Sequence, residues 1–383
     1  MDAFPIQALL GWYRRHRREL PFRPREGRAA DAYHVLVSES MAQQTQIATV
    51  VPYFERFVAA YPTVEALAGA EEQAVLKLWQ GLGYYRRARH LRAAAVMVVE
   101  RFGGKVPATV AELMELPGVG HYTAGAVASV AHGVAAPVVD GNVARVLARF
   151  YLIREAVDRP ATLRELWGHA GRLVEASGEP ADFNQAMMEL GALVCTPKSP
   201  SCGDCPLAEG CGARREGVAE TLPIKSPKRR PTAVTHRVLA EQRGSEFLFV
   251  QRPTRGLWAG MWELVGHEDA SHAAEDSAAP STGRDAARED QERRARRQEA
   301  DREADVWVAR VAERFGLKVG PPVRVGEFPH QTTHRRIRFL VSRTHVLRGD
   351  LREGSGVWRR LDKLDDLPLA KPQWAALRMI DPD

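Results

Sequence analysis

Four cysteines are the residues in this chain whose type and spacing most clearly suggest chemistry. They are the only cysteines, and all lie within residues 195–211, in the pattern Cys195-x6-Cys202-x2-Cys205-x5-Cys211. A disulfide framework would be spread along the chain, so the clustering indicates a metal site in a reducing compartment. Four thiolates can hold an iron–sulfur cluster or a structural zinc ion, although a zinc ribbon usually has two Cys-x2-Cys pairs and this segment has one.

A glycine turn followed by an aspartate is the second candidate site. Residues 116–123 read Leu-Pro-Gly-Val-Gly-His-Tyr-Thr and separate two runs with helical periodicity. Two of the three turn residues, Gly118, Val119 and Gly120, lack a side chain. The N–H groups of the turn and the N-terminus of the next helix can therefore approach a phosphate. Asp140 follows about twenty residues later, before a further helical run. By itself it would be an ordinary helix N-cap.

The elements that must position these residues are of two kinds. A length of 383 residues suggests two domains. Over residues 1–212, apolar residues recur at three- and four-residue spacing, which predicts a helical domain that includes the cysteine loop. The clearest runs are 33–60, 71–79, 86–101 and 123–131. Residues 213–231 end in a basic, proline-containing segment and are predicted to be a linker.

Residues 232–383 are predicted to form an α+β domain. Alternation of apolar and polar residues predicts strands over Val234–Ala240, Glu246–Gln251 and Arg335–Arg343. Helical periodicity predicts a helix over Val306–Phe315. Residues 268–305 interrupt this domain and contain no Val, Ile, Leu, Met or aromatic residue. Such a stretch cannot bury enough apolar surface to order itself, so we predict a disordered insertion there.

The overall composition restricts the class of protein. Hydrophobic residues make up 45% of the chain, enough for packed cores, and the net charge of +6 favours polyanionic partners. The first 20 residues contain no long apolar run, and no stretch of 18 apolar residues occurs anywhere. We therefore expect no signal peptide, no membrane span and a cytoplasmic location.

Three further segments narrow the family. They read Val-Ser-Glu-Ser-Met-Ala-Gln-Gln-Thr-Gln at 37–46, Trp-Gln-Gly-Leu-Gly-Tyr-Tyr-Arg-Arg-Ala-Arg at 79–89, and Asp-Phe-Asn-Gln-Ala-Met-Met-Glu-Leu-Gly at 182–191. Together with the cysteines, the hairpin and the aspartate, they resemble MutY-type DNA glycosylases of the helix–hairpin–helix superfamily. The resemblance covers residues 12–212 almost continuously. It implies a multidomain protein whose all-α glycosylase domain carries a [4Fe-4S] cluster on the four cysteines.

The resemblance also implies a reaction and a partner. The substrate would be duplex DNA with adenine opposite 8-oxoguanine or guanine, bound by a monomer. Glu39, protonated, would donate a proton to adenine N7, while ionised Asp140 would stabilise the oxocarbenium-like sugar or trap it. Asn142 would orient Asp140 or the water. Endonuclease III-like enzymes have a lysine where this chain has Tyr122. Because a phenol cannot form a Schiff base, we expect base removal with little or no strand cleavage.

By the same resemblance, Arg23 and Gln185 line the adenine pocket, and Gln44 and Tyr84 fill the gap that the extruded base leaves in the stack. The match has departures near that pocket. Phe22 stands where the family usually has tryptophan, four extra residues follow Arg23, and alanine replaces the usual leucine at position 42. The packing of the pocket is therefore expected to differ from the family pattern.

The second domain resembles the Nudix-like domain of MutY-type proteins, through residues 251–263. A Nudix hydrolase needs a glutamate-rich helix to hold Mg²⁺, and the corresponding segment, 309–317, has one acidic residue. We therefore expect this domain to read the oxidised guanine. The family uses a Phe-Ser-His turn for this contact, and the aligned residues here are Thr332, Thr333 and His334.

Three other functions remain compatible with parts of the sequence. The first is a thymine or uracil mismatch glycosylase on the same scaffold, which Tyr122 alone does not exclude. The second is a non-catalytic iron–sulfur protein that binds DNA, which the presence of both Glu39 and Asp140 disfavours. The third is a nucleotide pyrophosphohydrolase, which the loss of acidic residues from segment 309–317 disfavours.

Overall fold

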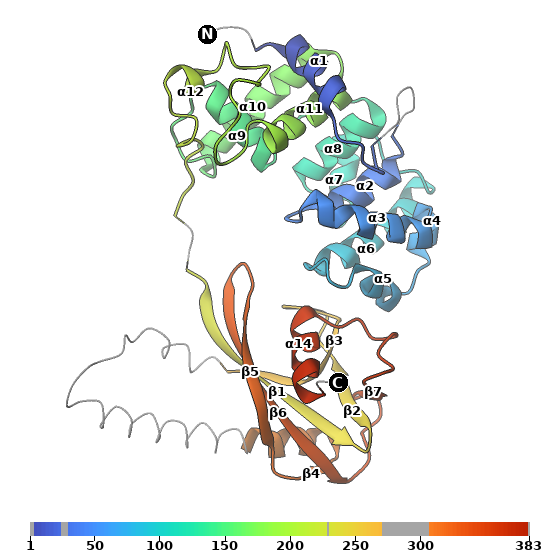
Figure 1. Ribbon diagram of the computed structural model, residues 1–383. Coiled ribbons are helices and arrows are strands. Elements are labelled where there is room, and N and C mark those ends of the chain that lie inside the picture. Colours follow the sequence, from blue (N-terminus) through green and yellow to red (C-terminus); the bar gives the residue numbers. More distant parts are fainter. Residues whose placement is uncertain (1–3, 24–29, 228–229, 270–305, 382–383) are drawn as a thin grey trace, which may run out of the picture. The chain divides into compact units, whose positions relative to one another are not determined.

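The computed structural model describes residues 4–23, 30–227, 230–269 and 306–381. The chain forms two compact units, Met1–Lys228 and Arg229–Asp383 (Figure 1). No helix in these described ranges is both long and apolar enough to cross a membrane. Most of the predicted insertion, residues 270–305, lies outside the described residues. Its predicted start is too early, because residues 268 and 269 belong to a strand.

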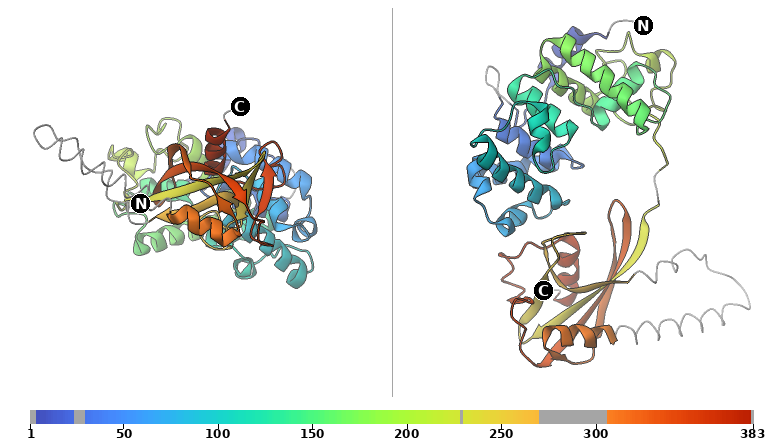
Figure 2. Two further views of the ribbon diagram at one scale, coloured as in Figure 1. Left: turned by 90° about the horizontal axis from the view of Figure 1, so that it is seen from below. Right: turned by 180° about the vertical axis from the view of Figure 1, so that it is seen from behind.

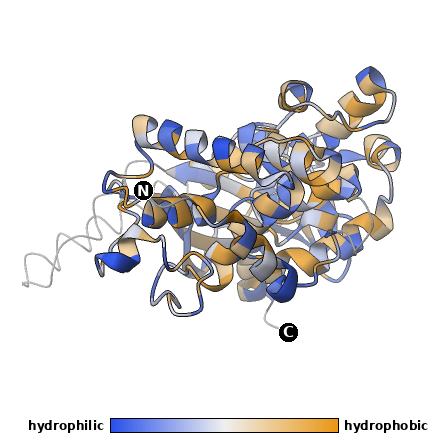
Figure 3. Ribbon diagram, turned by 90° about the horizontal axis from the view of Figure 1, so that it is seen from above, coloured by the Kyte–Doolittle hydropathy of each residue, from blue (hydrophilic) through white to orange (hydrophobic). Residues whose placement is uncertain are grey.

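The first unit is helical. Its helices are α1 (Ile6–His16), α2 (Ala32–Ala42), α3 (Ile47–Ala60), α4 (Val64–Ala68), α5 (Glu72–Trp79), α6 (Arg86–Phe102), α7 (Val110–Glu115), α8 (His121–His132), α9 (Gly141–Phe150), α10 (Pro160–Ser177), α11 (Pro180–Leu193) and α12 (Gly212–Arg215). Hydrophobic and hydrophilic stretches alternate along single helices, as expected when one face of each is buried (Figure 3). The run predicted over 33–60 is two helices, because residues 43–46 leave the helical conformation.

Helix α8 links the parts of this unit that matter for the site. It packs against α2 on one side and against α11 on the other. Its residue Gly125 allows the segment before α9 to approach α8 closely, because a Cβ there would lie 2.3 Å from the carbonyl oxygen of Pro137. A core cluster that includes Leu9, Leu147 and Leu190 joins α1, α9 and α11. Residues from distant parts of the sequence are thereby held around the start of α8.

Residues 213–226 differ from the linker prediction, because they pack on the helical unit. Leu222 is buried, and its carbonyl accepts a hydrogen bond from Arg149 Nε at 2.9 Å. Val157 N–H donates to the carbonyl of Ile224 at 3.0 Å. The prediction rested on the basic, proline-containing end of the segment and overlooked the apolar side chain at position 222, which anchors it.

The second unit is built on a seven-stranded sheet in the order β4-β6-β1-β3-β2-β7, with β5 paired to β6. Its strands are β1 (Thr232–Arg243), β2 (Glu246–Gln251), β3 (Trp262–Asp269), β4 (Lys318–Val319), β5 (Val323–Gln331), β6 (Arg335–Arg348) and β7 (Val357–Arg360). Strands β1 and β6 run parallel, and the other pairs are antiparallel. The three strands predicted from alternation are confirmed.

Helices cover both faces of this sheet (Figures 1 and 2). On β2, Phe247 and Phe249 point into a core cluster that includes Leu377 of α14 (Lys371–Ile380). Leu248 points the other way, into a cluster with Phe315 of the helix over 306–315. This period of two is what a strand buried on both faces requires. The predicted α+β architecture is confirmed.

Candidate active site

Glu39 is the carboxyl that α2 presents beside α8. Helix α2 begins at an N-cap, Asp31, whose side chain accepts from the N–H of His34 at 3.0 Å. Most of its side chains are buried, and the Oε2 atom of Glu39 is enclosed without a hydrogen-bond partner in the described part of the chain. Burial, helped by the charge of Asp140, raises the pKa of Glu39 to about 7 against the lowering effects of Tyr122 and Arg23. This carboxyl is therefore poised to hold a proton near neutral pH.

Asp140 is the N-cap of α9, and its hydrogen bonds stabilise the charged carboxylate. Its Oδ1 accepts from the N–H groups of Asn142 at 2.9 Å and Val143 at 2.7 Å. Its Oδ2 accepts from Asn142 Nδ2 at 2.8 Å. Burial raises the pKa of Asp140, and these three bonds, with the charge of Arg145, act against that rise. Burial thus raises the pKa of both carboxyls, but in Asp140 three hydrogen bonds to the carboxylate act against that rise.

Tyr122, in the first turn of α8, interacts with both of these acids. Burial raises its pKa well above the ordinary value, and the charges of Glu39 and Asp140 raise it further. Its hydroxyl also donates to the sulfur of Met188 on α11 at 3.4 Å. The residues predicted as catalytic from α2, α8 and α9 are therefore brought together. Their individual roles stay predictions.

Arg145 connects Asp140 to the cysteine loop. Its Nη2 donates to Asn142 Oδ1 at 2.8 Å and to the carbonyl of Gly191 at 2.6 Å. Its Nε donates to the carbonyl of Cys195 at 2.7 Å. A continuous chain of hydrogen bonds therefore runs from the aspartate through an amide and a guanidinium to the first cysteine. The position of the carboxylate depends on the packing of that loop.

The four cysteines lie beside a buried cation. Arg149, which is 2% exposed, donates from Nη1 to the sulfur of Cys195 at 3.2 Å. The sulfur of Cys211 lies 3.6 Å from the Arg149 carbonyl oxygen. Burial and the charges of the other three cysteines raise the pKa of Cys205 to about 11. Thiolates at this place therefore need a positively charged partner to be stable.

The donor set fits an iron–sulfur cluster. Iron–sulfur clusters take four Cys ligands, and Cys195, Cys202 and Cys211 lie close enough to Cys205 for their charges to raise its pKa. The loop that carries Cys195, Cys202, Cys205 and Cys211 suits such a cluster, with the Arg149 guanidinium balancing its charge.

Arg23 lies close enough to Glu39 for its charge to lower the pKa of that carboxyl, and Gln185 is buried on α11. Both side chains have protein partners. Arg23 Nη2 forms an ion pair with Glu189 Oε2 at 2.7 Å, and Glu189 is 1% exposed. Hydrogen bonds from Arg18 and Arg23 hold the pKa of Glu189 at about 2 against its burial. Gln185 lies one helical turn earlier on α11 and donates to the Ala181 carbonyl at 3.2 Å. Their contact with adenine stays a prediction, and the four extra residues lie outside the described residues.

The hairpin joins α7 to α8. Gly118 has a φ of +79°, and a Cβ there would lie 2.6 Å from the Cβ of His90, so the position requires glycine. Gly120 is the N-cap of α8, with extended backbone. The N–H groups at the start of α8 therefore follow a turn with little side-chain bulk, a geometry suited to phosphate.

Gln44 and Tyr84 form two exposed tips with strained backbones. Gln44 has a φ of +58° and Tyr84 a φ of +50°, in the left-handed region that side chains other than glycine rarely adopt. Gln44 is exposed, and 47% of Tyr84 is accessible. Strained residues of this kind gather at functional sites. The observation supports their predicted contact with the base stack, which stays a prediction.

Thr333 and His334 lie in the tight turn between β5 and β6. Both side chains are exposed. Thr332 shapes the turn, because its Oγ1 accepts from the N–H of Arg335 at 3.1 Å, and the His334 carbonyl accepts from the N–H of Thr232 at 2.9 Å. The hydroxyl and the imidazole are thus held at the tip of a hairpin. Reading of a base by this turn stays a prediction.

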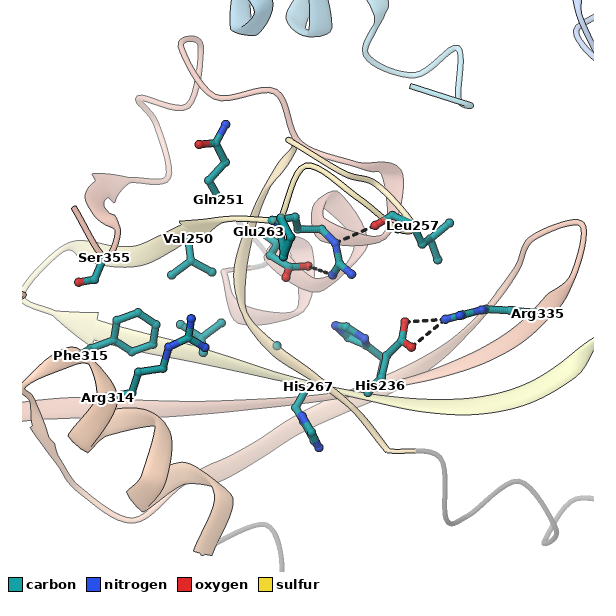
Figure 4. Close-up of a pocket in the computed structure, with 16 residues that line it drawn as sticks. His236, Val250, Gln251, Leu257, Glu263, His267, Arg314, Phe315, Arg335 and Ser355 are labelled. Carbon is teal, nitrogen blue, oxygen red and sulfur yellow. Dashed lines mark hydrogen bonds and ion pairs between the residues drawn. The ribbon is translucent and has the colours of Figure 1, made fainter. Parts of the chain in front are cut away.

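A cavity of about 430 Å³ lies elsewhere in the second unit (Figure 4). Arg252 pairs there with Glu263 at 2.6 Å. The helix over 306–315 contributes Arg314 and Phe315 to its lining. His236 is 2% exposed, and burial lowers its pKa to about 3, so its ring is neutral. The cavity therefore mixes charges of both signs, with three arginines and two glutamates among its lining residues.

The functional contacts of Arg87, Arg145 and Arg149 were not predicted from the sequence. Arg87 stands in a run of basic residues that is typical of a solvated helix face. Arg145 and Arg149 interrupt an apolar run in α9, and both are nearly fully buried. An arginine within an otherwise apolar helical pattern indicates a buried guanidinium. Because a buried charge must have partners, this pattern could have predicted a structural role for Arg145 and Arg149.

Models of three known families match this chain. The HhH-GPD superfamily base excision DNA repair protein model matches residues 37–170. The iron-sulfur binding domain of endonuclease III matches residues 195–211, and the NUDIX domain matches residues 237–379. The fold and the site thus define a protein of the helix–hairpin–helix class, with an iron–sulfur loop and a Nudix-like second domain.

Adenine DNA glycosylases are similar in sequence. The human protein is 40% identical over 307 aligned positions, covering 67% of this chain and 56% of its own length. The Arabidopsis thaliana protein is 39% identical over 304 positions, covering 69% of this chain and 48% of its own length. The Mycolicibacterium smegmatis protein is 43% identical over 217 positions, covering 57% of this chain and 71% of its own length. The chain spans about half the length of the first two. It belongs to the adenine DNA glycosylase family.

Proposed function

We propose that this chain removes adenine from duplex DNA in which adenine is paired with 8-oxoguanine or guanine. The observation that carries the proposal is the pair of carboxyls at positions 39 and 140. One is enclosed, with a pKa of about 7, and the other accepts three hydrogen bonds that favour its charged form. Hydrolysis of a glycosidic bond uses one carboxyl as an acid and a second to stabilise the cationic sugar.

The reaction begins with extrusion of the adenosine, because the bond to be cleaved is inaccessible within the stack. Glu39 then gives its proton to N7 of adenine, which makes the base a better leaving group. Its raised pKa keeps that proton available near neutral pH, and bound DNA would exclude water further. Arg23 and Gln185, on the side of α11, would contact the base.

Asp140 stabilises the positive charge that develops on the sugar as the bond breaks, or traps the sugar covalently. Its position beneath the sugar is maintained by Asn142, and through it by Arg145. Glu39 or a neighbouring group then activates the water that completes hydrolysis. Cys195, Cys202, Cys205 and Cys211 would hold the iron–sulfur cluster, whose role would be structural. It would stabilise the basic loop around Lys198 for contact with DNA.

Tyr122 makes this a base-removing enzyme without strand cleavage. A lysine there would provide an amine that attacks the sugar and leads to cleavage. The phenol has a pKa well above its ordinary value and acts as a hydrogen-bonding group. The similarity to adenine DNA glycosylases favours adenine over thymine or uracil as the released base.

The second unit would read the oxidised guanine through Thr333 and His334, at the tip of the turn between β5 and β6. A hydroxyl and an imidazole can each donate or accept a hydrogen bond. We also propose that the chain acts as a monomer, which light scattering with and without DNA would test, and that it is cytoplasmic, which cell fractionation would test.

The decisive experiment is a glycosylase assay on the full chain with its cluster. Duplexes carry adenine opposite 8-oxoguanine, guanine or thymine, and parallel duplexes carry a thymine or uracil mismatch. We expect breaks at adenine that require alkali, and none with Glu39→Gln. Release of thymine or uracil in place of adenine would overturn the substrate assignment. Breaks without alkali would overturn the inference from Tyr122.

A further inference from the structure

The two exposed tips, Gln44 and Tyr84, share a single anchor. Gln44 lies between α2 and α3, and Tyr84 lies between α5 and α6. Each holds a left-handed backbone conformation that is unfavourable for its residue type. Such conformations persist only when the surroundings fix them. The structure therefore has to provide contacts that hold both loops.

Arg87, in the first turn of α6, provides these contacts. Its Nη1 donates to the carbonyls of Ser40 at 3.0 Å, Met41 at 2.7 Å and Gln43 at 2.6 Å. Its Nη2 donates to the hydroxyl of Thr45 at 3.2 Å and to the carbonyl of Gly83 at 3.1 Å. Two of these partners, Gln43 and Thr45, flank the first tip, and Gly83 directly precedes the second. One guanidinium thus bonds to the neighbours of both strained residues.

Two aromatic rings complete the surroundings of this guanidinium. Its Cζ lies 5.3 Å from the ring centre of Tyr84 and 5.6 Å from that of Trp79. Trp79 is fully buried and donates to the same Gly83 carbonyl at 3.1 Å. Burial lowers the pKa of Arg87 to about 10, so the group is still charged at neutral pH. The Arg87 guanidinium therefore packs against the buried ring of Trp79 and also contacts the exposed ring of Tyr84.

We infer that Arg87 is a positioning residue that holds Gln44 and Tyr84 together as one rigid wedge for opening the base stack. The inference rests on the proposed function, because the wedge acts on the DNA that the enzyme repairs. A lysine cannot replace the fork of donors, since its ammonium is a single point of charge. Loss of the fork releases both loops, and the extruded state of the target base is then less populated.

The test compares Arg87→Lys with Arg86→Lys. Arg86 is the matched control, because it is exposed, lies one residue earlier and donates from Nε to His90 at 3.2 Å. The substrate is a duplex with 2-aminopurine beside the target adenine, whose fluorescence rises when that adenine leaves the stack. We expect Arg87→Lys to lower the fluorescence rise and to slow single-turnover adenine release by at least about tenfold. Arg86→Lys should stay within about twofold of the unsubstituted chain.

A double-mutant cycle separates positioning from general damage to the fold. If Arg87 acts through the wedge, Arg87→Lys should cost far less when Tyr84→Ala is already present, because coupled residues do not add. Full additivity, or an unchanged fluorescence rise in Arg87→Lys, would overturn the inference. Should Arg87→Lys not fold, Thr45→Val removes one acceptor of the guanidinium, and an unchanged rise in that variant would overturn it equally.

The same experiment distinguishes this inference from the proposed function. If the unsubstituted chain releases no adenine from any duplex, the proposed function is wrong. The fluorescence rise is measured independently of base release, so the effect of Arg87→Lys on unstacking is still determined. If the unsubstituted chain both unstacks and releases adenine while Arg87→Lys does the same, only the positioning role is wrong.

Discussion

Replacing Glu39 with glutamine should stabilise the fold at alkaline pH while removing activity. The pKa of this carboxyl rises from 4.5 to about 7 on folding, mainly through burial. Between these values the folded chain holds a proton that the unfolded chain has lost, so stability falls as pH rises through this window. The full rise corresponds to roughly 3 kcal/mol of unfolding free energy. Well above pH 7 the carboxylate is charged in the folded chain, and the fold is destabilised by this full amount.

Glutamine removes the charge and hence the pH dependence. From the titration of one such group, about 2 kcal/mol of the cost is added between pH 5.5 and pH 8.5. For a unit of this size, the melting temperature of Glu39→Gln relative to the unsubstituted chain should rise by about 4–8 °C over that interval. The amide's own packing cost is the same at both pH values and cancels in the comparison.

The assay is thermal unfolding of both proteins, with cluster bound, at the two pH values. Glu55→Gln on α3 is the control, because Glu55 is exposed and the same substitution there should give no pH-dependent difference. Adenine release by Glu39→Gln should fall by at least about 100-fold, since general acid catalysis contributes that much. A melting difference that does not change with pH would refute the idea that this carboxyl is held protonated by burial.

Three other substitutions test single contacts. Tyr122→Phe removes a hydrogen bond that lowers the pKa of Glu39, so the alkaline limb of the kcat/KM profile should move to higher pH; a downward shift would contradict this. Arg145→Lys breaks the chain of bonds from the aspartate to the cysteine loop, and adenine release should fall at least about tenfold, whereas equal rates would remove its positioning role. Arg252→Met leaves the buried Glu263 unpaired and should destabilise the second unit by roughly 3 kcal/mol at pH 8. Because burial raises the pKa of Glu263, that loss should shrink at pH 5, and an unaltered unfolding curve would be the opposing result.

The sequence predicted most of what depends on residues close together in the chain. The cysteine spacing, the Gly118–Gly120 turn and the aspartate that follows it can each be read within a short segment, because a loop or a cap is formed by neighbours. Period-two alternation predicted the central strands of the second unit in the same way. The linker prediction failed where one apolar residue, Leu222, outweighed a basic composition.

Only the tertiary structure decided the electrostatics of the site and the anchoring of its loops. The pKa of Glu39 depends on atoms from α2, α8 and α9. The loss of solvent around this carboxyl therefore cannot be predicted from the sequence of any one of these segments. Arg87 looks like an ordinary basic residue until its partners, far away in sequence, are seen. The apolar run around Arg145 indicates burial but does not show which groups it bonds to. Chain spacing determines which groups are present, whereas their protonation and rigidity depend on packing between segments that the sequence separates.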